Sequence, residues 1–224
     1  MTDIDTTIAD LVAHAQPQLA AGLPDEARAA FGAELDRLVR QGTPAGVAAP
    51  GTAMPDGDLL DAYGEPTTLA AARAGRPAVV VFYRGAWCPY CNLTLRAYQE
   101  TLVGELEARG VALMALSGQK PDGSLSMAEK HDLTYAVLSD PGNRIAEQLG
   151  IVFTPGEAAR EAQAALGIEL TEINADGTAR LPLAATVLVD ATGTIRWIDV
   201  HPDFTTRSEP GRILAAVDSL PAAG

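Results

Sequence analysis

Positive charge and long apolar segments are both scarce in this sequence of 224 residues. It carries 16 lysine and arginine residues against 29 aspartate and glutamate residues, a formal net charge of −13. Nucleic acids and anionic membrane surfaces attract basic patches, so we expect neither as a partner. The longest dense apolar run, residues 78–83, is far shorter than the roughly 20 residues that span a bilayer.

The start of the chain also lacks the features of a secretory signal. Residues 1–5 read MTDID, which is acidic where a signal would be basic and then apolar. Hydrophobic residues make up 47% and charged residues 20% of the chain, which is typical of globular proteins and excludes a disordered class. We therefore expect a globular cytoplasmic protein.

Cysteine is the scarcest chemically reactive residue, with only Cys88 and Cys91 present. Two neighbouring cysteines cannot build a disulfide framework. A structural zinc site usually takes four Cys or His ligands, and the three histidines, His14, His131 and His201, are far away in the sequence. No glycine-rich phosphate loop or carboxylate pair stands out, so we expect no metal and no other cofactor. With a disulfide framework and a zinc site set aside, the interpretation that remains for the two cysteines is a redox-active Cys-x-x-Cys in a reducing compartment.

The apolar pattern divides the chain into two parts. Two amphipathic helices are predicted between residues 4 and 41, followed by a Gly-, Ala- and Pro-rich segment over 42–57. We expect a helical extension over residues 1–45, which serves packing or dimerisation, and one domain over residues 46–224.

The second part alternates between strand and helix patterns. After a hairpin at 59–67 and a helical turn at 69–74, strands are predicted at 78–83, 111–116, 136–138, 186–190 and 194–198. Helices are predicted at 91–110, 125–130, 142–149, 155–166 and 209–220. This order predicts an α/β domain with a mixed central sheet flanked by helices.

The cysteine pair stands where a buried strand gives way to a helix. Unpaired N–H groups and the helix dipole stabilise a thiolate at such a place, where Cys-x-x-Cys thiols titrate between about 3.5 and 7.5. Arg84, between the strand and the pair, adds a positive charge. Cys88 and Cys91 share one helical turn, so oxidation of one can be resolved by the other.

Residues 81–93, VFYRGAWCPYCNL, resemble the peroxiredoxin-like branch of the thioredoxin superfamily, the alkyl hydroperoxide reductase and thiol-specific antioxidant proteins. Similar segments are LSDPG at 138–142, ATVLVD at 185–190 and DFTTR at 203–207, so the resemblance covers about residues 46–220. It implies a thioredoxin fold and a thiol peroxidase that acts on hydrogen peroxide or small organic hydroperoxides. It also implies re-reduction by a thioredoxin-like protein or a low-molecular-weight thiol.

The chain departs from the family's pattern in three places. Peroxiredoxins carry Pro-x-x-x-Thr-x-x-Cys, and this spacing puts Arg84 at the proline, Cys88 at the threonine and Cys91 at the peroxidatic cysteine. They also place an arginine six residues before the aspartate that ends the later strand. Here that aspartate is Asp190, and Ala184 stands at the arginine's position.

Three functions fit the resemblance. In a peroxidase, the Cys91 thiolate attacks the peroxide and Cys88 resolves the sulfenic acid, with Arg84 and Arg207 in place of the missing arginine. In a thiol–disulfide oxidoreductase, Cys88 is the exposed nucleophile and Cys91 the resolving thiol, and Cys-Pro-Tyr-Cys is shared with glutaredoxins. A non-catalytic redox sensor would only form the disulfide.

Three further residues lie next to the two thiols in the sequence. Trp87, Pro89 and Tyr90 are candidates for substrate or partner contact, and core packing suits Trp87 and Tyr90 equally well. Arg207 lies in a polar loop where a capping or salt-bridge role is also open. The first helices and the exposed strand edges of this fold are compatible with a homodimer.

Overall fold

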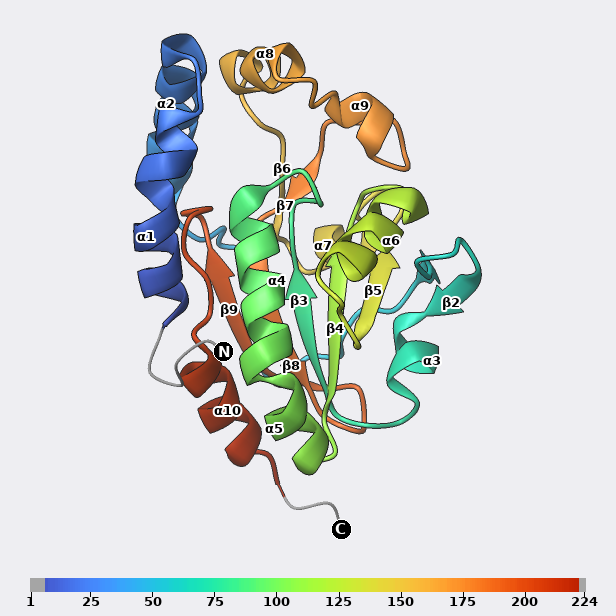
Figure 1. Ribbon diagram of the computed structural model, residues 1–224. Helices are drawn as coiled ribbons and strands as arrows, with labels where there is room; N and C mark the ends of the chain where they lie inside the picture. Colours follow the sequence, from blue (N-terminus) through green and yellow to red (C-terminus); the bar gives the residue numbers. More distant parts are fainter. Residues whose placement is uncertain (1–6, 222–224) are drawn as a thin grey trace.

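The computed structural model describes residues 7–221, and in that part of the chain one mixed sheet forms the centre (Figure 1). Its seven strands run in the order β2-β1-β5-β4-β3-β8-β9. Their bounds are β1 Asp58–Leu60, β2 Pro66–Thr68, β3 Ala78–Phe82, β4 Ala112–Ser117, β5 Ala136–Ser139, β8 Ala184–Val189 and β9 Ile195–His201. A separate pair joins β6 (Val152–Phe153) to β7 (Leu181–Pro182).

The central strand, β3, is buried on both faces, as its unbroken apolar sequence predicts. It runs parallel to β4 and antiparallel to β8. Val79 and Val81 pack into one hydrophobic cluster, and Ala78, Val80 and Phe82 into the other. This alternation follows from the two-residue period of a strand and divides the core into two layers.

The described residues form ten helices, which have the following bounds. They are α1 Ile8–Ala21, α2 Asp25–Gln41, α3 Leu69–Arg73, α4 Pro89–Thr101, α5 Val103–Ala108, α6 Pro121–Lys130, α7 Arg144–Gln148, α8 Glu157–Ala165, α9 Leu170–Ile173 and α10 Pro210–Asp218. Helices α1, α4, α5 and α10 pack with Val79 and Val81, whereas α3 and α7 pack with the opposite cluster. The predicted mixed α/β architecture is confirmed.

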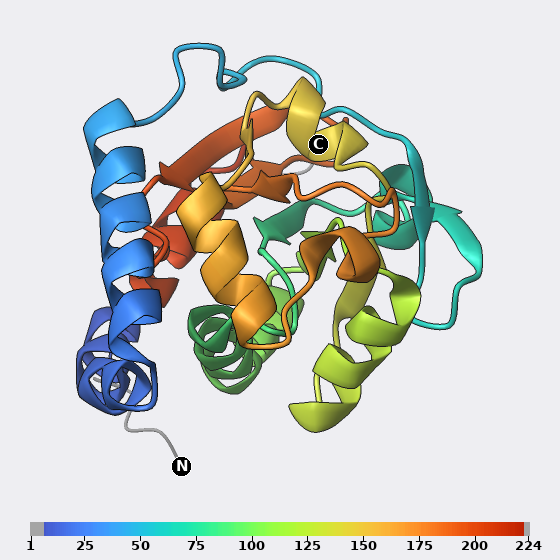
Figure 2. The same cartoon turned by 90° about the horizontal axis from the view of Figure 1, so that it is seen from above.

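The two N-terminal helices lie against the rest of the described structure. Helix α1 packs on α4 through the buried residues Ile8 and Val12, and α2 lies beside α8 (Figure 2). The carboxylate of Glu209 accepts hydrogen bonds from the backbone N–H groups of Ile8 (2.8 Å) and Ala9 (2.9 Å). The first helix was predicted to begin near Ile4, which lies outside the described residues. The boundary at residue 45 stays a prediction.

Two parts of the sequence prediction were wrong. The helix predicted over 91–110 is interrupted at Leu102, which separates α4 from α5. The β-branched Thr101 and Val103 and the flexible Gly104 lower helix propensity at that point. The strand pair β6–β7 and the one-turn helix α9 were not predicted, because segments of two to four residues carry no measurable periodicity.

Candidate active site

The two cysteines stand at the junction between the central strand and the helix that follows it. β3 ends at Phe82, and Cys88 is the N-cap residue of α4. Pro89 takes the first helical position, where its missing N–H costs no hydrogen bond and its fixed φ suits the helix. Cys91 therefore lies in the first turn, where free backbone N–H groups and the helix dipole favour negative charge.

The loop that leads to Cys88 is held from inside the protein. Gly85 has a φ of +149°, and a Cβ at this position would collide with the indole of Trp87. The Gln119 side chain accepts a hydrogen bond from the backbone N–H of Ala86 (2.8 Å) and donates one to the Tyr83 hydroxyl (2.9 Å). Gln119 follows β4, and nothing in the sequence pattern signalled this role.

Each thiol lies within hydrogen-bond distance of an arginine. Cys88 and Cys91 are both free thiols, with exposed fractions of 0% and 1%. Nη2 of Arg84 donates to Cys88 Sγ at 3.1 Å, and Nη2 of Arg207 donates to Cys91 Sγ at 3.2 Å. The structure thus brings together the two cysteines and the two arginines that the sequence singled out.

Arg207 reaches the site from the loop between β9 and α10. Its Nη1 donates to two carbonyl oxygens of its own loop, at 2.8 and 2.6 Å. The hydroxyl of Tyr98, on α4, donates to the Ser208 carbonyl at 2.5 Å. The helix that carries Cys91 therefore also anchors the loop that carries its arginine.

Arg84 is buried between two aromatic rings. Its guanidinium carbon lies 4.2 Å from the ring centroid of Phe204 and 5.2 Å from that of Trp87. A cation over an aromatic face is attracted to it, and the attraction grows when water is excluded. Nε of Arg84 has no hydrogen-bond partner among the described residues.

The surroundings of the two thiols drive their pKa values apart. Burial opposes ionisation of Cys88, but the Cys91 thiol donates to its sulfur and Arg84 and Arg207 add positive charge, so its pKa lies well below the ordinary value. Burial raises the pKa of Cys91, and the hydrogen bond and charge of Cys88 raise it further, well above the ordinary value. One negative charge is favoured in this pair, and it is placed on Cys88.

Two histidines lie near this centre without touching the thiols. His131 follows α6, and its Nε2 contacts Oδ1 of Asn92 at 2.9 Å, while Asn92 donates to the carbonyl of Cys88 at 2.9 Å. His201 contacts Asp199 (3.2 Å) at the base of the Arg207 loop. Sequence reasoning missed Asn92 and His131, since only the fold brings α6 to α4.

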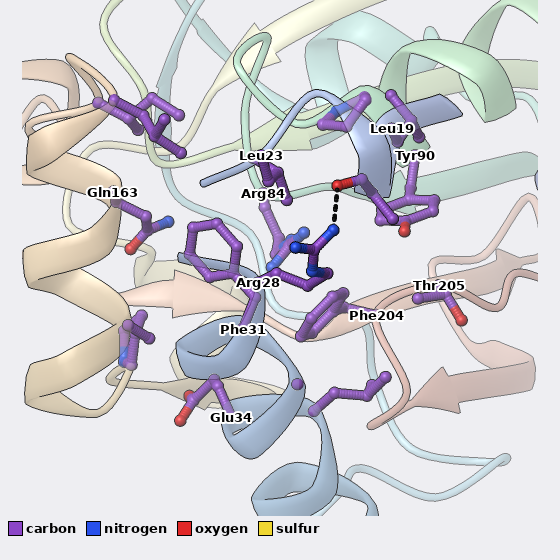
Figure 3. Close-up of a pocket in the computed structure, with 18 of the residues that line it drawn as sticks. Leu19, Leu23, Arg28, Phe31, Glu34, Arg84, Tyr90, Gln163, Phe204 and Thr205 are labelled. Atoms are coloured by element: carbon purple, nitrogen blue, oxygen red, sulfur yellow. Dashed lines mark hydrogen bonds between the residues drawn. The ribbon is translucent and has the colours of Figure 1, made fainter. Parts of the chain in front are cut away.

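A chamber of about 290 Å³ lies beside the cysteine loop (Figure 3). One wall is formed by Trp87, Pro89 and Tyr90, the three predicted contact residues, together with Phe204. The facing walls come from α1, α2 and α8. Arg207 lines a separate, smaller pocket against α1. The N-terminal helices, which were expected to serve packing or dimerisation, thus also enclose space next to the thiols.

Comparison with known proteins identifies the family. The model of the AhpC/TSA family matches residues 50–198, most of the chain. The chain belongs to the AhpC/TSA family. Among curated relatives of this AhpC/TSA chain, chloroplastic peroxiredoxin Q of Sedum lineare is 28% identical over 101 residues, covering 45% of this chain and 53% of the relative. Peroxiredoxin Bcp of Escherichia coli K12 is 32% identical over 107 residues, 48% of this chain and 64% of the relative.

The chain spans about half the length of the first of these curated relatives. Solved structures confirm the predicted peroxiredoxin-type thioredoxin fold. Peroxidoxin BcpB of Mycobacterium tuberculosis aligns with a TM-score of 0.59 at 19% identity, over 77% of this chain and 98% of that one. Reduced Prx3 of Vibrio vulnificus, in a complex with hydrogen peroxide, aligns with a TM-score of 0.61 at 19% identity, over 76% and 99%.

Within residues 7–221, no group of three or more His, Cys, Asp or Glu side chains is arranged to hold a metal ion. In that same part of the chain, none of the helices combines the length and apolar character needed to cross a bilayer.

Proposed function

We propose that this protein is a thiol-dependent peroxidase that reduces hydrogen peroxide or organic hydroperoxides through Cys88 and Cys91. The observation that carries the proposal is the burial of both reduced thiols beneath arginine side chains. A peroxide is small enough to enter the closed site of the reduced protein, whereas the disulfide of another protein needs a sulfur at the surface in this reduced state. Re-reduction, in contrast, acts on the oxidised protein. Membership of the AhpC/TSA family supports the same choice.

The first step uses the thiolate that the site favours. The Cys88 thiolate attacks the nearer peroxide oxygen and the O–O bond breaks, which leaves a sulfenic acid on Cys88. The departing oxygen takes a proton and leaves as water or an alcohol. Arg84 stabilises both the thiolate and the charge that develops on the departing oxygen. This order reverses the roles that the family spacing suggests, since the hydrogen bond from Cys91 and the charge of Arg84 favour the thiolate on Cys88.

The second step closes the disulfide. Cys91, which loses its proton beside Arg207, attacks the Cys88 sulfur and displaces the hydroxyl as water. The two thiols have then supplied the two electrons that reduced the peroxide. An external dithiol of the thioredoxin type, or a low-molecular-weight thiol, returns the pair to the reduced state. Such reductants belong to a reducing compartment, and we place the protein in the cytoplasm, with a homodimer as its assembly.

A thiol–disulfide oxidoreductase is the second candidate. Its support is local, because Cys88 combines the helix N-cap position with a lowered pKa. Nucleophilic cysteines of disulfide oxidoreductases share both properties. The complete burial of Cys88 is the observation against it.

The proposal is tested with reduced wild type, Cys88→Ser and Cys91→Ser. Each protein receives one equivalent of hydrogen peroxide with a sulfenic-acid trap and is followed by intact mass. We expect rapid trapping on Cys88 in Cys91→Ser, no fast reaction in Cys88→Ser, and rapid disulfide formation in wild type. Rapid trapping on Cys91 instead would exchange the two roles within a peroxidase. Slow oxidation of all three proteins would refute the peroxidase.

A further inference from the structure

The chamber beside the cysteine loop is built from two parts of the chain. The inner wall belongs to the family-matched region, whereas α1 and α2, residues 8–41, precede the matched residues 50–198. Phe31 and Leu35 of α2 face the chamber, opposite Tyr90 and Phe204. Its shape therefore depends on a segment that lies outside the family match.

The size of the chamber exceeds what hydrogen peroxide requires. A water molecule needs only about 10–15 Å³ of cavity, whereas pockets for small organic ligands begin at about 300 Å³. The chamber measures about 290 Å³, at the threshold for an organic ligand. A two-oxygen molecule alone would leave most of this apolar surface in contact with water.

The charged side chains at the chamber are already engaged within the protein. Arg28 donates to the Ala20 carbonyl at 3.2 Å and pairs with Asp25. Glu34 pairs with Arg37 at 2.6 Å. These contacts leave a largely apolar lining, which favours an uncharged apolar group over a charged one.

The end of the chamber beside the thiols has a different character. Arg84 lines it there and donates to Cys88 Sγ, so the chamber ends one side chain away from the favoured thiolate. Unpartnered polar atoms in the lining residues are Nε of Arg84, Nε1 of Trp87 and, on the α8 wall, Oε1 of Gln163. The first two are fully buried donors next to the thiols, so this end of the chamber lies against polar groups, whereas the rest of its lining is apolar. Figure 3 shows Arg84 among the aromatic side chains that surround it.

We propose that this chamber binds the apolar body of a bulky alkyl or aryl hydroperoxide and directs its peroxide group towards Arg84 and Cys88. The N-terminal helices then determine selectivity for such substrates over hydrogen peroxide. This inference rests on the proposed peroxidase function and names the substrate class of the same site.

The test uses Gly32, a chamber residue in α2 where an added side chain meets nothing within 4 Å. Gly104 in α5 is the matched control, since it also has open space but lies outside the chamber. Gly32→Phe fills part of the chamber, whereas Gly104→Phe does not. Rates are measured with cumene hydroperoxide and with hydrogen peroxide, under the same reductant.

We expect Gly32→Phe to lower kcat/KM for cumene hydroperoxide by about tenfold or more, the effect of a steric change in an apolar pocket. Its kcat/KM for hydrogen peroxide, and both values of Gly104→Phe, stay at the wild-type level. Equal effects of Gly32→Phe on the two peroxides, or none on either, would overturn the inference while leaving the peroxidase intact.

Binding is measured separately from turnover with 2-phenyl-2-propanol, the alcohol that cumene hydroperoxide yields. The chain has two tryptophans, so Trp197→Phe leaves Trp87 in the chamber wall as the fluorescent reporter. The alcohol should quench Trp87 in this background and fail to do so when Gly32→Phe is added. Absence of quenching in the Trp197→Phe background contradicts the chamber. A protein that consumes neither peroxide overturns the proposed function itself, whatever the binding result.

Discussion

The two arginine–thiol pairs contain the same chemical groups but are assembled differently. Arg84 and Cys88 are four residues apart, joined by one tight loop. Arg207 and Cys91 are 116 residues apart, and a hydrogen bond from Tyr98 anchors the arginine's loop to α4. The contact distances, 3.1 and 3.2 Å, are nearly equal.

The pKa values nevertheless move in opposite directions. Both thiols are buried beside a guanidinium, so neither burial nor the arginines alone explain why Cys88 is lowered and Cys91 raised. The interaction between the two thiols makes the difference, because the hydrogen bond between them lowers the pKa of Cys88 and raises that of Cys91. A charge on one thiol then suppresses a charge on the other.

Exchange of each arginine for methionine should have the largest effect and tests whether the two arginine–thiol pairs have different roles. Loss of one preorganised donor costs roughly 10²–10³ in rate, so Arg84→Met should slow the reaction with hydrogen peroxide by about a hundredfold. Arg207→Met should slow this first step less, because Arg207 donates its hydrogen bond to Cys91 and reaches Cys88 only through its charge. The rates are measured by stopped-flow tryptophan fluorescence, with Arg84→Lys as the charge-retaining control. A larger loss in Arg207→Met would assign the first step to Cys91.

Titration of the single-thiol variants separates the contributions to each pKa. The wild-type Cys88 thiolate is lost as the pH falls through its pKa, which lies well below that of an ordinary thiol. Cys91→Ala removes the thiol donor, so the pKa of Cys88 rises and less thiolate remains at neutral pH. Cys88→Ala removes the neighbouring negative charge, so the pKa of Cys91 falls below its wild-type value. Ultraviolet thiolate absorbance against pH measures both shifts, and unchanged curves would refute the coupling.

Glu209→Gln should have the smallest effect and should act only on the pair formed by Arg207 and Cys91. The Glu209 carboxylate caps the start of α1, and loss of such a cap costs about 1 kcal/mol, measurable by urea unfolding. Since Glu209 follows Arg207 by two residues, we also expect slower disulfide formation with an unchanged first step. Asp10→Asn is the control, because Asp10 caps the same helix from outside the Arg207 loop. A slower reaction of Glu209→Gln with peroxide, the first step, would contradict the assignment of the Arg207 loop to disulfide formation alone.

Sequence periodicity was sufficient wherever an element was long and one of its faces met the core. The apolar residues 78–82 gave a buried strand, and the final helix predicted at 209–220 was found at Pro210–Asp218. The predicted helix over 91–110 was too long because its apolar residues keep their spacing across the break at Leu102. Periodicity reports which face is buried, not whether every residue keeps helical backbone angles.

The candidate site was predictable to the extent that it is local. Cys88, Cys91 and Arg84 lie within eight residues of one another, so the loop and the first helical turn suffice to place them together. Gln119 and His131 carry no local signal, because their roles arise only when β4 pairs with β3 and the end of α6 comes beside α4. The chamber could not be foreseen at all, since amphipathic helices reveal that they are buried but not what they enclose.

The sequence by itself therefore determined the redox pair, its position at a strand–helix junction and the class of fold, because these depend on short spacings and on periodicity. The tertiary structure alone decided which arginine meets which thiol, because Arg207 reaches Cys91 only through the packing of its loop on α4. It also decided that helices α1, α2 and α8 enclose an apolar chamber beside Cys88, since the close approach of distant segments is a property of the packed core.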